Sequence, residues 1–122
     1  MFEGLRTVIY PVSDLNQAKA WYSALLGQDP YFDEPFYVGY TVGGFELGLD
    51  PNSTSASGGG PTTYWGVQDI HAAYAQILAH GAGEHTPVTA VGDGILTAVA
   101  TDPFGNPVGL IFNPHFSVAT VR

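Results

Sequence analysis

Residues 7–27 read TVIYPVSDLNQAKAWYSALLG, and this stretch decides the fold. A β-rich run precedes Ser13 and Asp14, either of which can cap a helix N-terminus. Gly27 follows the helical pattern, at a position where a left-handed cap is common. Residues 62–81 read TTYWGVQDIHAAYAQILAHG and give the same signals in the same order. Asp69 lies 55 positions after Asp14 and occupies the equivalent position before the second predicted helix. The sequence therefore predicts two similar modules.

Each module is predicted to be one strand, one helix and three further strands, a βαβββ unit. Gly43-Gly44 is typical of a two-residue hairpin turn because both positions tolerate positive φ, and residues 102–106, DPFGN, are typical of a longer turn. The predicted strands are 5–12, 29–33, 36–42 and 45–49 in the first module and 62–67, 84–91, 95–101 and 108–112 in the second.

A flexible stretch separates the modules. Residues 51–60, PNSTSASGGG, are small and polar, as in a linker. Residues 45–51, FELGLDP, also parallel residues 108–114, VGLIFNP, at an offset of 63 rather than 55. We therefore place module one at about 1–50, module two at about 61–114 and a tail at 115–122, and expect eight extra residues in the second module.

Composition narrows the class of partner. A chain of 122 residues is the length of one domain. Only 11% of its residues are charged, against about 25% in an average protein, so much of its surface is uncharged. We therefore expect a homodimer, in which a second copy covers part of this uncharged surface. The net charge is −8 and the cations are only Arg6, Lys19 and Arg122, which excludes nucleic acid and anionic membranes as partners.

The chain also lacks the sequence features of disulfide-bonded, secreted and membrane-spanning proteins and of enzymes with a cysteine or serine nucleophile. It contains no cysteine, which excludes disulfides, thiolate metal sites and cysteine nucleophiles. We find no signal peptide and no run long enough to span a membrane, and expect a cytoplasmic protein. No serine nucleophile motif occurs either.

Alternation along the strands predicts which side chains face the helix. In residues 45–49, Phe45, Leu47 and Leu49 form the apolar set that should meet the helix, which leaves Glu46 and Gly48 on the other face. We expect an α+β fold. If its two mixed sheets curve toward each other, these other faces would line a cleft, but the periodicity predicts only the faces and not the curvature.

With these features in place, the chain resembles the vicinal oxygen chelate superfamily, which contains glyoxalase I, bleomycin resistance proteins and extradiol dioxygenases. The resemblance rests on the V-x-D-L motif at 12–15, Trp21-Tyr22 in the helix, the V-x-D-I motif at 67–70 and the DPFGN turn. It covers nearly the whole chain, and it implies a single domain built from both modules around one cleft.

The resemblance also implies where metal ligands would stand. Metal-dependent members place His or Gln seven residues before the Asp of each V-x-D motif, where this chain has Thr7 and Thr62. They place a Glu in the last strand of each module, where this chain has Glu46 and Gly109. One carboxylate without nitrogen ligands cannot hold a divalent metal tightly, so we expect no metal and no cofactor.

The four histidines do not replace the missing ligands. None is spaced to form a helical i, i+4 pair. We expect His71 and His85 at the surface and His80 at a helix C-terminus, where the dipole favours it, while a role for His115 at the mouth of the cleft stays open.

Glu46 and several aromatic residues are the remaining site candidates. Two interpretations of Glu46 stay open: it is a hydrogen-bond acceptor or base toward a ligand, or it is a half-exposed carboxylate on an edge or at an interface. Tyr64 shares the face of Thr62, and Tyr40 is expected on the face that opens to the cleft. Tyr37 is left undecided, and Trp21 and Trp65 are expected in the core.

We therefore expect a glyoxalase- or bleomycin-resistance-like protein that binds and sequesters a small molecule without metal. Its ligand would be planar or cationic and would contact Thr7, Tyr40, Glu46, Thr62 and Tyr64. The alternative is a glyoxalase-like lyase or isomerase with a non-standard metal site or with Glu46 as the catalytic base. A third possibility is a purely structural dimer.

Overall fold

A computed structural model describes residues 1, 5–52 and 62–115. The chain divides into two compact units, Met1–Gly59 and Gly60–Arg122, so the boundary falls inside the predicted linker. Residues 53–60 of that linker and 116–122 of the tail lie outside the described residues. Among the described helices, none is long and apolar enough to cross a membrane.

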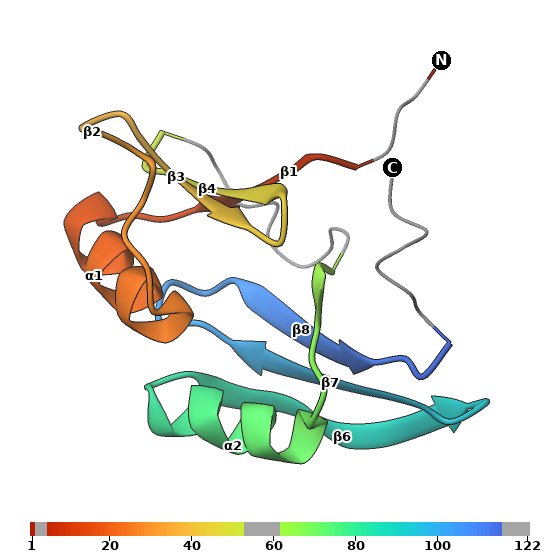
Figure 1. Ribbon diagram of the computed structural model, residues 1–122. Helices are drawn as coiled ribbons and strands as arrows, with labels where there is room; N and C mark the ends of the chain where they lie inside the picture. The colour runs from red at the N-terminus through yellow and green to blue at the C-terminus, as the bar shows by residue number, and fades with distance from the viewer. Residues whose placement is uncertain (2–4, 53–61, 116–122) are drawn as a thin grey trace. The chain divides into compact units, whose positions relative to one another are not determined.

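The first unit is the predicted βαβββ unit. Its strands form one mixed sheet in the order β1-β4-β3-β2, with β1 parallel to β4 and the other pairs antiparallel. The helix lies along one face of this sheet (Figure 1). The elements are β1 (Thr7–Pro11), α1 (Leu15–Leu26), β2 (Phe32–Glu34), β3 (Tyr37–Val42) and β4 (Phe45–Asp50).

Local signals set the ends of α1. The Asp14 side chain accepts a hydrogen bond from the Gln17 amide at 3.0 Å, and Gly27 adopts the left-handed conformation at φ 68°. Between these caps, Ala18 and Tyr22 are buried against the sheet. The strands contribute Val38, Tyr40, Leu47 and Leu49, each at most 2% exposed, and these residues form the core of the unit.

The second unit repeats the order. Its sheet runs β5-β8-β7-β6, with β5 parallel to β8, and α2 packs on it (Figure 1). Asp69 caps α2 by accepting from the Ala72 amide at 3.1 Å, and Ile70, Tyr74 and Ile77 are buried. The elements are β5 (Tyr64–Gly66), α2 (Ile70–Ala79), β6 (Gly83–Gly92), β7 (Ile95–Thr101) and β8 (Pro107–Phe112).

The DPFGN turn joins β7 to β8 through a buried polar network. Asp102 and Asn106 are 3% and 4% exposed. One Asp102 oxygen accepts from the amides of Phe104 and Asn106 at 2.9 and 2.8 Å, and the other accepts from the Asn106 side chain at 3.1 Å. The carboxylate therefore satisfies the turn backbone, which explains why the motif needs Asp at its first position.

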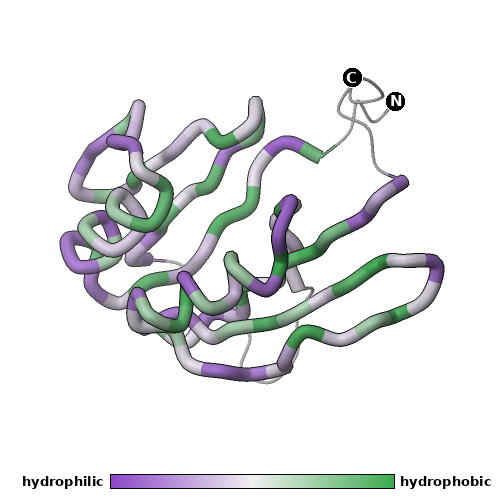
Figure 2. The backbone as a smooth tube through the Cα atoms, turned by 60° about the horizontal axis from the view of Figure 1, so that its bottom comes forward, coloured by the Kyte–Doolittle hydropathy of each residue, from purple (hydrophilic) through white to green (hydrophobic). Residues whose placement is uncertain are grey.

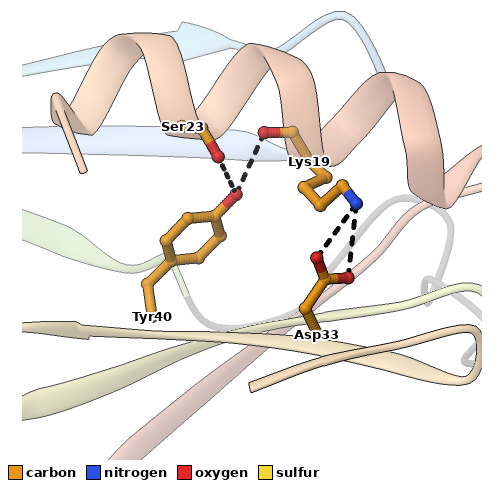
Figure 3. Close-up of polar contacts among 4 residues, drawn as sticks. All are labelled: Lys19, Ser23, Asp33 and Tyr40. Carbon is orange, nitrogen blue, oxygen red and sulfur yellow. Dashed lines mark hydrogen bonds and ion pairs between the residues drawn. The ribbon is translucent and has the colours of Figure 1, made fainter. Parts of the chain in front are cut away.

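Strand alternation buries Leu47 and Leu49 on the helix side as expected, whereas Phe45, expected beside them, is 39% exposed. Apolar residues recur between polar ones along the strands (Figure 2). Tyr40, predicted to face the cleft, instead lies on the helix side and is fully buried. Its hydroxyl donates to the Lys19 carbonyl at 3.0 Å and lies 2.8 Å from the Ser23 hydroxyl, while Lys19 pairs with Asp33 at 3.1 Å (Figure 3). The prediction for Tyr40 was wrong, and its role is to fasten α1 to β3.

Candidate functional site

The first sheet carries a hydrogen-bonded cluster on the face away from α1. The Tyr31 hydroxyl donates to Glu46 Oε1, and the Tyr37 hydroxyl donates to Glu46 Oε2 at 2.5 Å. Tyr37 lies on β3 and Glu46 on β4, while Tyr31 lies just before β2. The backbone amide of Tyr31 donates a hydrogen bond to the Gly39 carbonyl at 3.0 Å, which holds this segment beside β3. We call Tyr31, Tyr37 and Glu46 the Glu46 site.

Two glycines form the floor of the Glu46 site. Gly39 and Gly48 pair across β3 and β4, so the sheet has no side chains at this point. A Cβ at Gly48 would overlap the Tyr37 hydroxyl and come within 2.5 Å of Tyr37 Cζ. A Cβ at Gly39 would lie 3.3 Å from ring atoms of both Tyr31 and Tyr37. The absence of side chains is therefore what lets the tyrosine rings lie on the sheet.

Both phenols are held in the neutral form. The hydrogen bond to Glu46 is the main cause that raises the pKa of Tyr31 above its usual 10.0. For Tyr37, partial burial raises the pKa most, followed by its hydrogen bond to Glu46. At neutral pH the two tyrosines therefore act as donors and Glu46 as the acceptor of both.

An aromatic patch continues from the Glu46 site to the edge of the sheet. The Phe32 ring lies 6.0 Å from Tyr37 and 6.5 Å from Tyr31, and the Phe36 ring lies 6.0 Å from Phe32, all measured between centroids. Tyr31 is 62% exposed, Phe36 58% and Phe32 37%. Such contiguous exposed aromatic surface is typical of a binding region.

The other predicted residues lie on both units. Thr7 is exposed and stands directly opposite Glu46 in the parallel pair of β1 and β4. In the second unit, Thr62 is exposed just before β5, and Tyr64 is 46% exposed. Tyr64 lies over Gly109, where a Cβ would come within 2.6 Å of its Cδ1, so this strand pair repeats the tyrosine-on-glycine arrangement.

The strand register corrects one predicted ligand position. Val12 donates its amide to Asp50 O, and Val67, its counterpart in the second unit, donates to Ile111 O. Asp50 therefore matches Ile111, which is an offset of 61 rather than 63. By the same offset Glu46 corresponds to Pro107, not to Gly109. The second unit has six extra residues relative to the helix offset of 55, not eight.

The side chains at these positions do not fit a divalent metal. Threonine hydroxyls stand at two of the four places and proline at the third, while each Glu46 oxygen already accepts a hydrogen bond from a phenol. Within the described ranges, no three His, Asp or Glu side chains are grouped closely enough to hold a metal ion. The donor set is thus one carboxylate with two phenolic partners.

The four histidines all belong to the second unit, whereas the Glu46 site belongs to the first. His71 and His85 are exposed, as predicted, and His80 is the C-cap of α2. His115 Nε2 lies 2.9 Å from the Asp93 carbonyl and 3.3 Å from its carboxylate, at the tip of the β6–β7 hairpin. Trp21 and Trp65, expected in the core, are only half-buried.

Neither Tyr31 nor Tyr37 is assigned to a site by the sequence. The available signal was the pair of glycines, because Gly39 and Gly48 leave space beside Glu46 in otherwise bulky strands. Which side chain fills that space depends on β2 and the segment before it, which pair with β3 only in the folded chain.

Comparison with known families now identifies the chain. Residues 4–110 match the model of the glyoxalase/bleomycin resistance protein/dioxygenase superfamily. The chain belongs to this superfamily. The match spans both βαβββ units, in agreement with the motifs at the two helix caps and the DPFGN turn.

Solved structures of the superfamily share the fold. A glyoxalase-related enzyme from Fulvimarina pelagi is 20% identical with a TM-score of 0.75, over 93% of this chain and 90% of that one. A lactoylglutathione lyase from Agrobacterium tumefaciens is 16% identical with a TM-score of 0.74, over 93% and 97%. A glyoxalase/bleomycin resistance protein from Albidiferax ferrireducens is 22% identical with a TM-score of 0.70, over 89% and 98%. No curated protein matches the sequence.

Proposed function

We propose that this superfamily member binds and sequesters a small molecule at the Glu46 site without a metal ion. The observation that carries the proposal is the occupation of both Glu46 oxygens by phenolic donors. In metal-dependent relatives the corresponding carboxylate would be a ligand, whereas here it is the centre of a hydrogen-bonded aromatic surface. Such a surface recognises a ligand by hydrogen bonds and ring contacts.

Thr7 extends this site along the sheet. Its exposed hydroxyl group belongs to the residue directly opposite Glu46, and a hydroxyl is both donor and acceptor. Thr62 and Tyr64 are proposed as ligand contacts on the second unit, on the strength of their exposure and of the Tyr64 ring on Gly109.

An NMR screen of small molecules against the full chain tests the proposal. The screen is run in the presence of a chelator, with neutral, anionic and cationic compounds in separate sets. We expect a hit that shifts the amides of Thr7, Tyr37 and Glu46, and that binds more weakly to the Tyr31→Phe/Tyr37→Phe double variant. Hits that bind only after metal is added, or a complete lack of hits, would contradict the proposal.

A catalytic alternative is favoured by the position of Glu46. It is the one carboxylate at a superfamily ligand position, is half-buried and lies on the exposed face of the sheet. In that case it would act as a base in a glyoxalase-like lyase or isomerase reaction. Turnover of a ligand from the screen that is abolished in Glu46→Gln, with binding retained, would establish this alternative.

We also propose a cytoplasmic homodimer. The low charged fraction of 11% leaves much uncharged surface, which a second copy would cover. Sedimentation equilibrium tests the assembly directly, and a single monomeric species at micromolar concentration would contradict it.

A further inference from the structure

The Glu46 carboxylate is anionic and lacks a cationic partner within the described part of the chain. Its contacts there are the two neutral phenols. Lys19 is engaged with Asp33 on the helix side of the sheet. Glu34 and Asp50 share the face of Glu46 through the register of β2, β3 and β4, so this face is acidic. A half-buried negative charge of this kind favours a ligand that brings a positive one.

The two oxygens of Glu46 retain hydrogen-bonding capacity. Each carboxylate oxygen has two lone pairs, and each accepts one phenolic hydrogen bond here. One lone pair on each oxygen therefore remains. A group with two parallel N–H donors, such as an amidinium or guanidinium, matches a carboxylate in this geometry, and an ammonium can use either oxygen.

The aromatic patch supplies the second part of the recognition. Tyr31, Phe32 and Tyr37 are linked by ring contacts directly beside the carboxylate, and Phe36 extends them. Exposed aromatic faces attract both flat rings and cations. The two features together describe a ligand with a positive charge next to a planar apolar part.

We propose that the Glu46 site selects planar organic cations that carry an amidinium, guanidinium or ammonium group next to an aromatic ring. The inference rests on the proposed function, which requires a small molecule at this site but leaves its chemistry open. The carboxylate binds the charged group, the tyrosine hydroxyls fix the carboxylate, and the aromatic patch packs against the ring. The absence of side chains at Gly39 and Gly48 leaves room for the tyrosine rings on the sheet.

Three probes of the same shape and different charge test the inference. Benzamidinium, benzamide and benzoate are titrated into the isotopically labelled full chain under chelating conditions, and backbone amide shifts are followed by NMR. We expect benzamidinium to shift the amides of Tyr31, Tyr37 and Glu46, with benzamide weaker by about tenfold or more and benzoate without effect, because only the cation pairs with Glu46.

Two glutamate variants separate the local contact from the general acidity of the protein. Glu46→Gln should weaken benzamidinium binding by about tenfold or more. Glu84→Gln removes the same charge from an exposed position on β6 of the second unit and should change the affinity by less than about twofold, because an exposed charge is screened by salt. Tyr40→Phe, on the helix side, should leave the affinity unchanged.

The outcomes distinguish the inference from the proposed function. Equal binding of benzamide and benzamidinium at the same residues would overturn the cation selectivity and still support a small-molecule site. Binding of all three probes elsewhere, equal losses in both glutamate variants, or no binding of any probe would overturn the inference. In the last case the broader screen decides the proposed function by itself.

Discussion

The neutral phenols around Glu46 show how residues on separate strands define one another's chemistry. Glu46 stabilises the protonated form of Tyr31 and Tyr37, and the tyrosines in turn satisfy one lone pair on each of its oxygens. This mutual dependence predicts both a pH effect and a steric effect. Each can be measured without knowledge of the ligand.

The pH effect appears in the alkaline range. The folded pKa values of both tyrosines lie above the ordinary 10.0, so the unfolded chain loses these protons first as the pH rises. Stability from this source is therefore complete below pH 10 and falls as the pH rises toward the folded pKa values. In Glu46→Gln we expect the Tyr31 pKa to return toward its ordinary value, while Tyr37 stays raised because partial burial is its first cause.

Tyrosine ring-carbon shifts followed by NMR against pH measure these titrations one residue at a time. Glu84→Gln serves as the matched control, and neither Tyr31 nor Tyr37 should respond to it. If the Tyr31 titration does not move in Glu46→Gln, the hydrogen bond that defines the Glu46 site is absent.

The steric effect concerns Gly48. In Gly48→Ala the new Cβ overlaps the Tyr37 hydroxyl and ring, so we expect a loss of about 1–3 kcal/mol in the free energy of unfolding. In a Tyr37→Ala background the same change should cost less than about 1 kcal/mol, because the overlapping atoms are gone. Denaturant unfolding of the four proteins measures the difference.

Gly66→Ala is the control for this double-mutant cycle of Gly48→Ala and Tyr37→Ala. Gly66 also lies in a strand, but no atom lies within 4 Å of a Cβ built there. A penalty for Gly48→Ala that is equal in both backgrounds, or matched by Gly66→Ala, would show that Tyr37 does not lie on Gly48.

At the scale of elements, one buried polar group links α1 to the sheet in addition to the apolar core. Tyr40 donates to the Lys19 carbonyl, so its single proton is used and the Ser23 hydroxyl must donate to Tyr40. We expect Tyr40→Phe to lower the free energy of unfolding by about 1–3 kcal/mol, since two hydrogen bonds are lost in a buried position. Ser23→Ala should cost less, because the bond to Lys19 remains.

Thermal or denaturant unfolding measures both variants, and probe binding at the Glu46 site supplies a second readout. We expect Tyr40→Phe to lower the free energy of unfolding and to leave probe binding unchanged. A stable Tyr40→Phe variant with impaired binding would return Tyr40 to the binding face and would contradict the structure.

The elements were predictable from the sequence where their signals are local. Asp14, Gly27 and Asp69 cap helices as expected, because capping depends on a few neighbouring residues. The face of Tyr40 is also set by a local signal, the Gly43-Gly44 turn. The Gly43-Gly44 turn pairs Val42 with Phe45, which places Tyr40 opposite the helix-facing Leu47.

The parts of the site that were missed depend on distant pairing. Tyr31 reaches Glu46 only because the segment before β2 is fixed to β3, and no sequence pattern states that pairing. The match of FELGLDP with VGLIFNP was misleading for the same reason, since similar letters do not fix the register. The backbone partners of Val12 and Val67 assign Pro107, rather than Gly109, to the position of Glu46.

At the scale of the whole molecule, two related units carry different chemistry on one superfamily fold. Both place a tyrosine over a glycine, Tyr37 on Gly48 and Tyr64 on Gly109, but of these two tyrosines only Tyr37 donates its hydroxyl to a carboxylate of the described residues. Superfamily membership therefore predicts the fold and leaves the activity to these side chains. The central claim is that a hydrogen-bonded carboxylate stands where metal-dependent relatives hold an ion.

Metal retention tests this claim most directly. The untagged full chain is incubated separately with nickel, zinc, manganese and ferrous ions, dialysed against metal-free buffer and analysed for metal per chain. We expect no stoichiometric retention of any ion, because the site has a single carboxylate and both of its oxygens already accept hydrogen bonds from tyrosine hydroxyls. About one ion per chain, lost in Glu46→Gln and kept in Glu84→Gln, would contradict the account and establish Glu46 as a metal ligand.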